Sequence, residues 1–267
     1  MVTEALLGIL SGFVAGVMGG AFGVGGAIIT TPAVQVLLGA RPIVAVGTPL
    51  PVIFPTTLSG MQAYRRARQI DYRAVRWAAP PGAVGAAGGA YLTKFIDARI
   101  LLLVTAGLIA WQAVRVGLGK SVVEVPGRPV HPSARAFVLM GLAAGIFSGL
   151  LGIGGGVVMV PIMAGVLQMP LKRALGTSLV IIAFLVIPGT VVHALLGHID
   201  WAIFLWLTLG VIPGAAVGSR WTMRARERTL RAVVATFLLL VAAAYGGLEA
   251  HDLLAVGIRA VARMATR

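Results

Sequence analysis

The stretch GGAFGVGG, residues 19–26, lies in the middle of the first hydrophobic segment, and five of its eight residues are glycine. A glycine inside a helix costs about 1 kcal/mol relative to alanine. The cluster therefore predicts a break in a segment that is otherwise apolar enough to lie in a membrane.

The composition places the whole chain in the class of membrane proteins. Of its 267 residues, 58% are hydrophobic and only 11% are charged, whereas a soluble domain has about a quarter of its residues charged. Apolar runs such as 174–192 are long enough to cross a hydrocarbon core about 30 Å thick. We expect an all-α, polytopic integral membrane protein in the inner membrane of a prokaryotic cell.

The charge and the missing cysteines exclude several function classes. A net charge of +14 suggests nucleic acid in a soluble protein, but here the arginines lie in short loops, as the positive-inside rule predicts. The absence of cysteine removes thiolate metal sites and cysteine nucleophiles. We expect no nucleic-acid partner, no metal, no cofactor and no catalytic residues, and therefore no enzyme.

The chain repeats itself at a constant offset of 129 residues. Residues 12–32 (GFVAGVMGGAFGVGGAIITTP) align without a gap to residues 141–161 (GLAAGIFSGLLGIGGGVVMVP). PPGAVG at 80–85 also resembles IPGAAVG at 212–218, after a small shift. The pattern predicts two homologous halves, 1–116 and 135–249, a hydrophilic linker at 117–134 and a basic amphipathic tail at 250–267.

Each half is predicted to contain one glycine-broken element followed by three transmembrane helices. The first element, 6–38, would form a helix of about 50 Å, which is too long for one ordinary span and too short for two. The expected segments are 6–38, 43–63, 73–93 and 99–116 in the first half, and 136–168, 173–195, 201–220 and 230–248 in the second.

Two geometries are open for the broken elements: a single crossing, or a re-entrant hairpin that turns back at the midplane. Hairpins leave three crossings in each half, invert the two halves, and place 16 of the 22 basic residues on one side of the membrane. Single crossings make the halves parallel and place only 12 there. The positive-inside rule favours two inverted repeats with re-entrant elements.

Inverted repeats with broken helices are typical of secondary transporters, whose substrate binds between the repeats. A half-helix that starts at a glycine break presents backbone N–H groups and a positive dipole end, which suits an anion. The alternative for the glycines is close helix packing, which we assign to Gly12, Gly16, Gly141 and Gly145. The candidate substrate-binding glycines are Gly23, Gly25, Gly26, Gly152, Gly154, Gly155 and Gly156.

Side chains near the breaks supply further candidates. The hydroxyls of Thr48, Thr177 and Ser178 can donate to an oxyanion, or can bond to their own helix or cap a neighbouring one. His193 is a candidate for proton coupling, although we expect it at the membrane interface. Asp71 and Asp200 are expected to be helix N-caps. Because no acidic residue lies deep in a span, the sequence leaves the coupling ion open.

The paired glycine motifs, their trailing prolines Pro32 and Pro161, and the Gly-Thr step in each half resemble the TauE/SafE sulfite exporter family, also called the toluene sulfonate uptake permease family. This resemblance implies a transporter of sulfite, sulfonates or related anions. The expected partners are a small anionic substrate, membrane lipid and a coupling ion, and a homodimer is left open. The rival functions are a non-transporting membrane assembly or anchor protein and, more weakly, a cation carrier.

Overall fold

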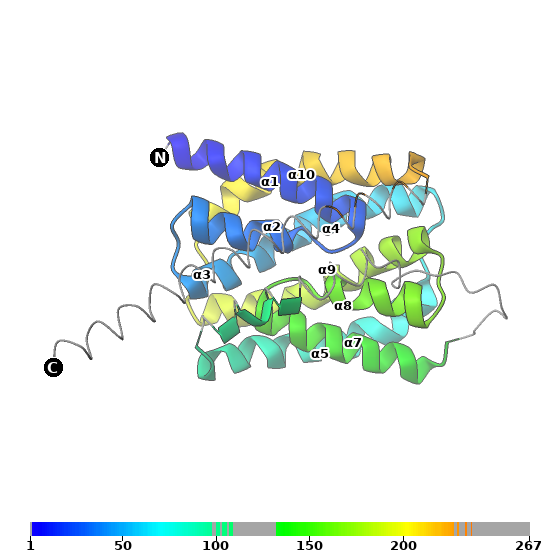
Figure 1. Ribbon diagram of the computed structural model, residues 1–267. Coiled ribbons are helices and arrows are strands. Elements are labelled where there is room, and N and C mark those ends of the chain that lie inside the picture. Colours follow the sequence, from blue (N-terminus) through cyan, green and yellow to red (C-terminus); the bar gives the residue numbers. More distant parts are fainter. Residues whose placement is uncertain are drawn as a thin grey trace, which may run out of the picture.

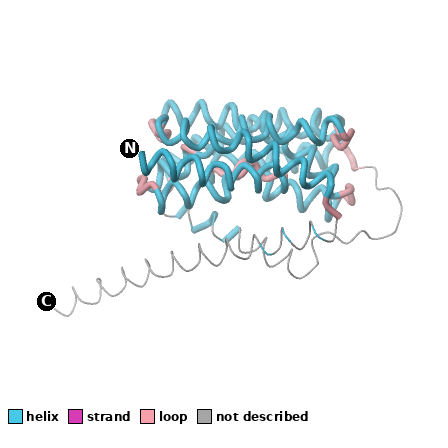
Figure 2. Tube along the Cα trace, turned by 90° about the horizontal axis from the view of Figure 1, so that it is seen from above, coloured by secondary structure: helices cyan, strands magenta, loops and turns pink. Residues whose placement is uncertain are grey.

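The computed structural model describes residues 2–97 and 132–226, with scattered positions between 100 and 108 and between 229 and 236. Within these ranges every regular element is a helix (Figures 1 and 2). Several predicted segments lie largely or wholly outside the described residues: the spans 99–116 and 230–248, the linker 117–134 and the tail 250–267.

Each half begins with a long helix, a glycine break and a short second arm, and then continues into further long helices. The first half contains α1 (Val2–Phe22), α2 (Ala27–Pro32), the π-helical turn η1 (Ala33–Leu37), α3 (Pro42–Gly47), α4 (Pro49–Arg66), α5 (Tyr72–Leu92) and the 3-10 turn η2 (Thr93–Phe95). The second half contains α7 (Ala134–Leu151), α8 (Gly156–Pro161), the π-helical turn η3 (Ile162–Val166), α9 (Leu171–Leu195) and α10 (Trp201–Arg224).

Five helical segments are long and apolar enough to cross a membrane, which confirms the prediction of an all-helical integral membrane protein. The helix α5 has the length of the predicted span 73–93 but is not one of the five, because its arginines, glycines and prolines lower its hydropathy. The five segments are Thr3–Phe22, Pro42–Arg66, Ala134–Leu151, Leu171–Leu195 and Trp201–Arg224.

Glycines allow the backbones of neighbouring helices to touch. A Cβ atom built on Gly16 would lie 2.5 Å from Val211 O in α10, and one built on Gly145 would overlap Gly82 O in α5. Small residues at such positions permit the close packing that holds membrane helices together. The packing role expected for Gly12, Gly16, Gly141 and Gly145 is therefore confirmed.

The contacts between helices advance in register and so give the helix directions. In α1, Gly12 and Gly20 lie against Leu207 and Ala215 of α10, so these two helices run parallel. The helices α5 and α7 are also parallel, because their contacts repeat those of α1 with α10 at the offset of 129. The helices α4 and α9 are antiparallel, because Gly176 near the start of α9 lies against Tyr64 near the end of α4.

Two bundles result, α1 with α4 and α10, and α5 with α7 and α9, which form the two layers of Figure 1. Each half of the sequence contributes helices to both bundles. The helices α1 and α7 start from opposite ends of the molecule, which favours the predicted inverted relation of the halves. Their orientation in the membrane stays a prediction.

Positive charge gathers at one end of the molecule, where α4 and α10 end and α5, α7 and α9 begin. Eleven of the thirteen described lysines and arginines lie there, while Arg41 and Lys94 lie at the opposite end. The positive-inside rule predicts that this basic end faces the cytoplasm. Its members are Arg65, Arg66, Arg68, Arg73, Arg76, Arg135, Lys172, Arg173, Arg220, Arg224 and Arg226.

The close approach of α5 and α7 predicts different outcomes for two glycine-to-alanine changes. Gly145→Ala places a methyl group against the backbone of Gly82, and we expect a loss of about 2 kcal/mol or more, measured by thermal unfolding in detergent. The control is Gly88→Ala, because a Cβ on Gly88 meets nothing within 4 Å and alanine favours the helix. Equal stability of the two variants would contradict the packing role.

Candidate functional site

The chain turns back on itself at each glycine break. The φ angles are 66°, 78° and 82° at Gly23, Gly25 and Gly26, a left-handed region that favours glycine. A Cβ atom on Gly26 would lie 2.6 Å from Ala15 O, so the start of α2 lies beside α1 rather than beyond its end. The first broken element is therefore a hairpin.

The second break has the same geometry. Its φ angles are 71°, 75° and 76° at Gly152, Gly154 and Gly155. A Cβ atom on Gly155 would lie 2.6 Å from Ala144 O, the counterpart of Ala15 at the offset of 129. Of the two geometries left open by the sequence, both elements adopt the hairpin.

The two breaks meet in the centre of the molecule. A Cβ atom on Gly25 or on Gly154 would lie within 3.0 Å of the Ile53 side chain and within 3.7 Å of Ile182. One on Gly156 would lie 2.5 Å from Gly23 O. Ile53 and Ile182 are close to the midpoints of the Pro42–Arg66 and Leu171–Leu195 segments, so the breaks lie at mid-depth. Both breaks and both isoleucines are buried.

The helices that leave the breaks begin without side-chain caps. Gly26 precedes α2 and Gly155 precedes α8, and neither can supply a capping oxygen from a side chain. The first N–H groups to bond within α2 are those of Ile29 and Thr30, to Gly26 O. The N–H groups just before them have no acceptor within their own helix. The arrangement can therefore present backbone donors to an anion at the centre.

The candidate hydroxyls hold structural hydrogen bonds. Thr48 Oγ1 accepts from the Asp200 N–H at 3.0 Å, and its counterpart Thr177 accepts from the Asp71 N–H at 2.9 Å. Ser178 Oγ donates to Gly23 O at 2.8 Å, which ties the first break to α9. The two aspartates cap α5 and α10, as expected. The threonines thus lie near the loops, whereas Ser178 reaches the break.

His193 is buried inside the protein, two residues before the end of α9, and its expected depth at the membrane interface stays a prediction. Its Nε2 lies 2.9 Å from Gly149 O, just as the hydroxyl of its counterpart Tyr64 lies 3.0 Å from Gly20 O. A carbonyl oxygen only accepts, so Nε2 carries the proton. In its neutral form His193 therefore accepts through Nδ1 from Nδ1–H of His198, at 3.1 Å. Through Gly149 O, His193 links the end of α9 to the last helical turn of α7, just before the second break.

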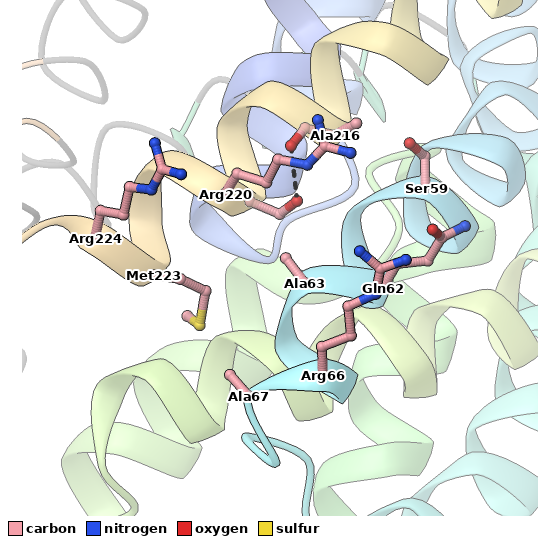
Figure 3. Close-up of a pocket in the computed structure, with 10 residues that line it drawn as sticks. Ser59, Gln62, Ala63, Arg66, Ala67, Ala216, Arg220, Met223 and Arg224 are labelled. Carbon is pink, nitrogen blue, oxygen red and sulfur yellow. Dashed lines mark hydrogen bonds between the residues drawn. The ribbon is translucent and has the colours of Figure 1, made fainter.

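A basic cavity at the ends of α4 and α10 was not predicted from the sequence. It encloses about 380 Å³ (Figure 3). The arginines had been explained by topology alone, although Gln62 and Arg66, and Arg220 and Arg224, are spaced i, i+4 and so share helix faces. The lining residues are Ser59, Gln62, Ala63, Arg66, Ala67, Ala216, Ser219, Arg220, Met223 and Arg224.

The hydrogen bonds of the two threonines predict a stability effect. Thr48→Val and Thr177→Val each leave a backbone N–H without its acceptor, and we expect each variant to lose about 1 kcal/mol in thermal unfolding. Thr56→Val is the control, because Thr56 Oγ1 bonds only within its own helix, to Val52 O. Full stability combined with lost transport would instead assign the hydroxyls to the substrate.

The histidine pair predicts a pH dependence of stability. Burial lowers the pKa of His198, in the loop after α9, below its usual 6.5. A lowered histidine pKa means that the stabilising contribution is complete above pH 6.5 and is lost as the pH falls through the lowered value. We expect the thermal stability to decrease between pH 7.5 and 5, and to decrease less in His198→Gln. An equal decrease in both proteins would contradict this assignment.

Known proteins resemble the chain over most of its length. It is 28% identical to "Probable membrane transporter protein YunE" of Bacillus subtilis, over 87% of this chain and 94% of the relative. It is 25% identical to "Probable membrane transporter protein MJ0441" of Methanocaldococcus jannaschii, over 86% of this chain and 91% of the relative. No solved structure matches.

A whole-family comparison agrees with these relatives. Residues 8–245 match the family described as "Sulfite exporter TauE/SafE", a span that includes both glycine breaks, most of the first long apolar segment and all of the other four. The family is one of membrane transporters, in keeping with the expectation that the chain is not an enzyme. The chain therefore belongs to the sulfite exporter TauE/SafE family.

Proposed function

We propose that this protein is a secondary transporter that moves a small, sulfur-containing anion, such as sulfite or a sulfonate, across the membrane by alternating access. The main support is the meeting of two glycine breaks midway along the Pro42–Arg66 segment and α9. Irregular backbone at membrane depth is tolerated where protein or a water-filled cavity covers it. The description of the family adds sulfite as a substrate class.

In this proposal the anion binds to peptide N–H groups at the starts of α2 and α8. Their positive dipole ends attract negative charge without a buried lysine or arginine. The glycines of both breaks, Gly23, Gly25, Gly26, Gly152, Gly154, Gly155 and Gly156, allow the anion to approach the backbone closely. Ile53 and Ile182 cover the breaks in the described conformation, so the anion reaches them only when these side chains move apart.

The moving parts in this proposal are the two bundles rather than the two halves of the sequence. α1 of the first half is packed backbone to backbone on α10 of the second, and α5 is packed in the same way on α7. Separating the halves would break both of these close interfaces. Rocking of α1, α4 and α10 against α5, α7 and α9 would leave both interfaces intact.

We propose supporting roles for the polar side chains around the breaks. Ser178 would position the first break through its bond to Gly23 O, and Thr48 and Thr177 would hold the loops beside the site. His193 stays the candidate for proton coupling, because it bonds the turn before the second break. The described acidic residues lie at or near the ends of the helices, so they do not suggest a carboxylate relay.

Two other functions make different predictions. A membrane anchor or assembly protein would carry no anion flux, whatever its glycines. A cation carrier would rely on the carbonyl groups of the breaks, whereas the uncapped helix starts at Gly26 and Gly155 favour an anion. Flux measured in proteoliposomes separates all three functions.

The test is uptake of sulfite, thiosulfate and sulfonates by proteoliposomes. We expect Gly26→Leu and Gly155→Leu to abolish uptake while the protein still inserts, because each side chain would meet the backbone of Ala15 or Ala144. Gly39→Leu is the matched control: its φ is 64°, but nothing lies within 4 Å of its Cβ position. Normal flux through both break variants would overturn the proposed site.

A further inference from the structure

The basic cavity presents three guanidinium groups from two helices. Arg66 belongs to α4, and Arg220 and Arg224 belong to α10 (Figure 3). Gln62 and Ser59 add polar groups to the α4 wall, which gives the cavity both charge and neutral hydrogen-bonding groups. Planar guanidinium groups bind oxyanions through paired N–H donors, so the lining matches the chemistry of a small oxyanion.

The described carboxylates do not neutralise this charge. Within residues 2–97 and 132–226, none of the three guanidinium groups forms an ion pair with a carboxylate. Asp71 is the one described carboxylate at the basic end, and its Oδ1 accepts from the N–H groups of Arg73 and Ala74. None of the described carboxylates therefore competes with a ligand for the positive charge of the cavity.

Hydrogen bonds join residues beside the cavity lining to the helix that precedes the first break. Tyr64 follows the lining residue Ala63, and its hydroxyl lies 3.0 Å from Ala21 O. Thr222 precedes the lining residue Met223, and its Oγ1 donates to the same carbonyl at 3.0 Å. Because Ala21 is two residues before Gly23, residues adjacent in sequence to the cavity lining are bonded to the end of the helix that leads into the break.

The cavity breaks the internal symmetry of the molecule. At the offset of 129, which the helix contacts obey, Arg66 corresponds to Leu195, Arg220 to Tyr91 and Arg224 to Phe95. Gln62 and Ser59 correspond to Val191 and Pro188. Equivalent helix ends are thus built without the arginines, so packing does not require them. Their function concerns only one side of the membrane.

We propose that this cavity is an oxyanion-binding vestibule, which captures the transported anion at the basic end and delivers it to the first break. Delivery rests on the proposed transport function, whereas binding does not. The phosphate of a lipid headgroup has similar chemistry. We assign the vestibule to the transported anion, because Tyr64 and Thr222, each adjacent in sequence to a lining residue, bond to the helix that enters the break.

The test compares two double variants that remove the same charge. Arg66→Gln/Arg220→Gln removes two guanidinium groups from the cavity. Arg73→Gln/Arg173→Gln removes two arginines of the same end that are also exposed, as Arg66 and Arg220 are, but do not line the cavity. With sulfite supplied to the basic end, we expect the first double variant to raise the half-saturating concentration about tenfold, with an unchanged maximal rate. The control double variant should stay close to wild type.

Further arms separate the other outcomes. With sulfite supplied to the opposite end, both double variants should match wild type. Liposomes of phosphatidylcholine alone and with phosphatidylglycerol test for lipid: if wild type requires phosphatidylglycerol and the cavity variant does not respond to it, the cavity binds headgroups and the vestibule is overturned. Equal half-saturating concentrations in the two double variants would also overturn it.

Calorimetric binding of sulfite to the purified proteins distinguishes failure of the vestibule from failure of transport. Gly26→Leu should keep binding at the cavity, and Arg66→Gln/Arg220→Gln should lose it. If these results hold but wild type carries no flux, the vestibule stands and the transport function fails. If wild type carries flux and the cavity variant binds and transports normally, transport stands and the vestibule fails. Absence of both binding and flux overturns both.

Discussion

Peptide groups at the centre of a membrane have no water to bond with, so a helix broken there must be covered by protein. In this protein each break is covered by the other half of the sequence. Ser178 of α9 donates to Gly23 O at the first break, and Gly156 lies against the same carbonyl. Gly152 at the second break lies against Val46 of α3. Each break thus takes part of its cover from the other half of the sequence, which ties the two repeats together in the fold.

The same constraint explains why glycine dominates the helix interfaces. To cover a break, the supporting helices must come close enough for backbones to touch, and α1 on α10 and α5 on α7 do so at successive glycines. Each such contact is lost when a Cβ is added, so the number of usable residues at these positions is small. The glycines that weaken each helix by themselves thus allow the tertiary packing that stabilises it.

The repeats, the breaks and most helix limits could be predicted from the sequence, because they depend on local composition and on a single offset. The partners of each helix could not, because the pairing of α1 with α10 joins the ends of the described chain. The small shift used to align 80–85 with 212–218 was wrong: Gly85 and Gly214 make matching contacts at the unshifted offset. The shifted alignment matched the prolines of the two helices, but these prolines do not occupy equivalent positions.

The candidate site also has one part that could be predicted from the sequence and one part that could not. The glycines of the breaks could be predicted, since their clustering has no other simple cause. The burial of His193 and the cavity around Arg66 could not, because both depend on which helix lies opposite. A histidine near a helix end and arginines in loops can both be explained by membrane topology. The burial of the histidine and the cavity around the arginine become visible only when α7 and α10 are packed beside them.

Departures from internal symmetry make the two ends of the molecule different. A perfectly symmetric pair of bundles would open equally to both sides, yet the polar ties between the bundles are unequal. Toward the basic end, Lys172 Nζ donates to Met223 O at 3.1 Å and Ser178 Oγ donates to Gly23 O, and both bonds join α9 to the opposite bundle. Under the offset of 129, Ser178 corresponds to Pro49, which has no hydroxyl, and Lys172 corresponds to Ile43. In the proposed transport cycle, opening at the basic end would separate two hydrogen-bonded pairs that have no equivalents at the other end among the described residues. Because Met223 also lines the cavity of Arg66 and Arg220, the bond that closes this end lies beside the charge that would attract an anion to it.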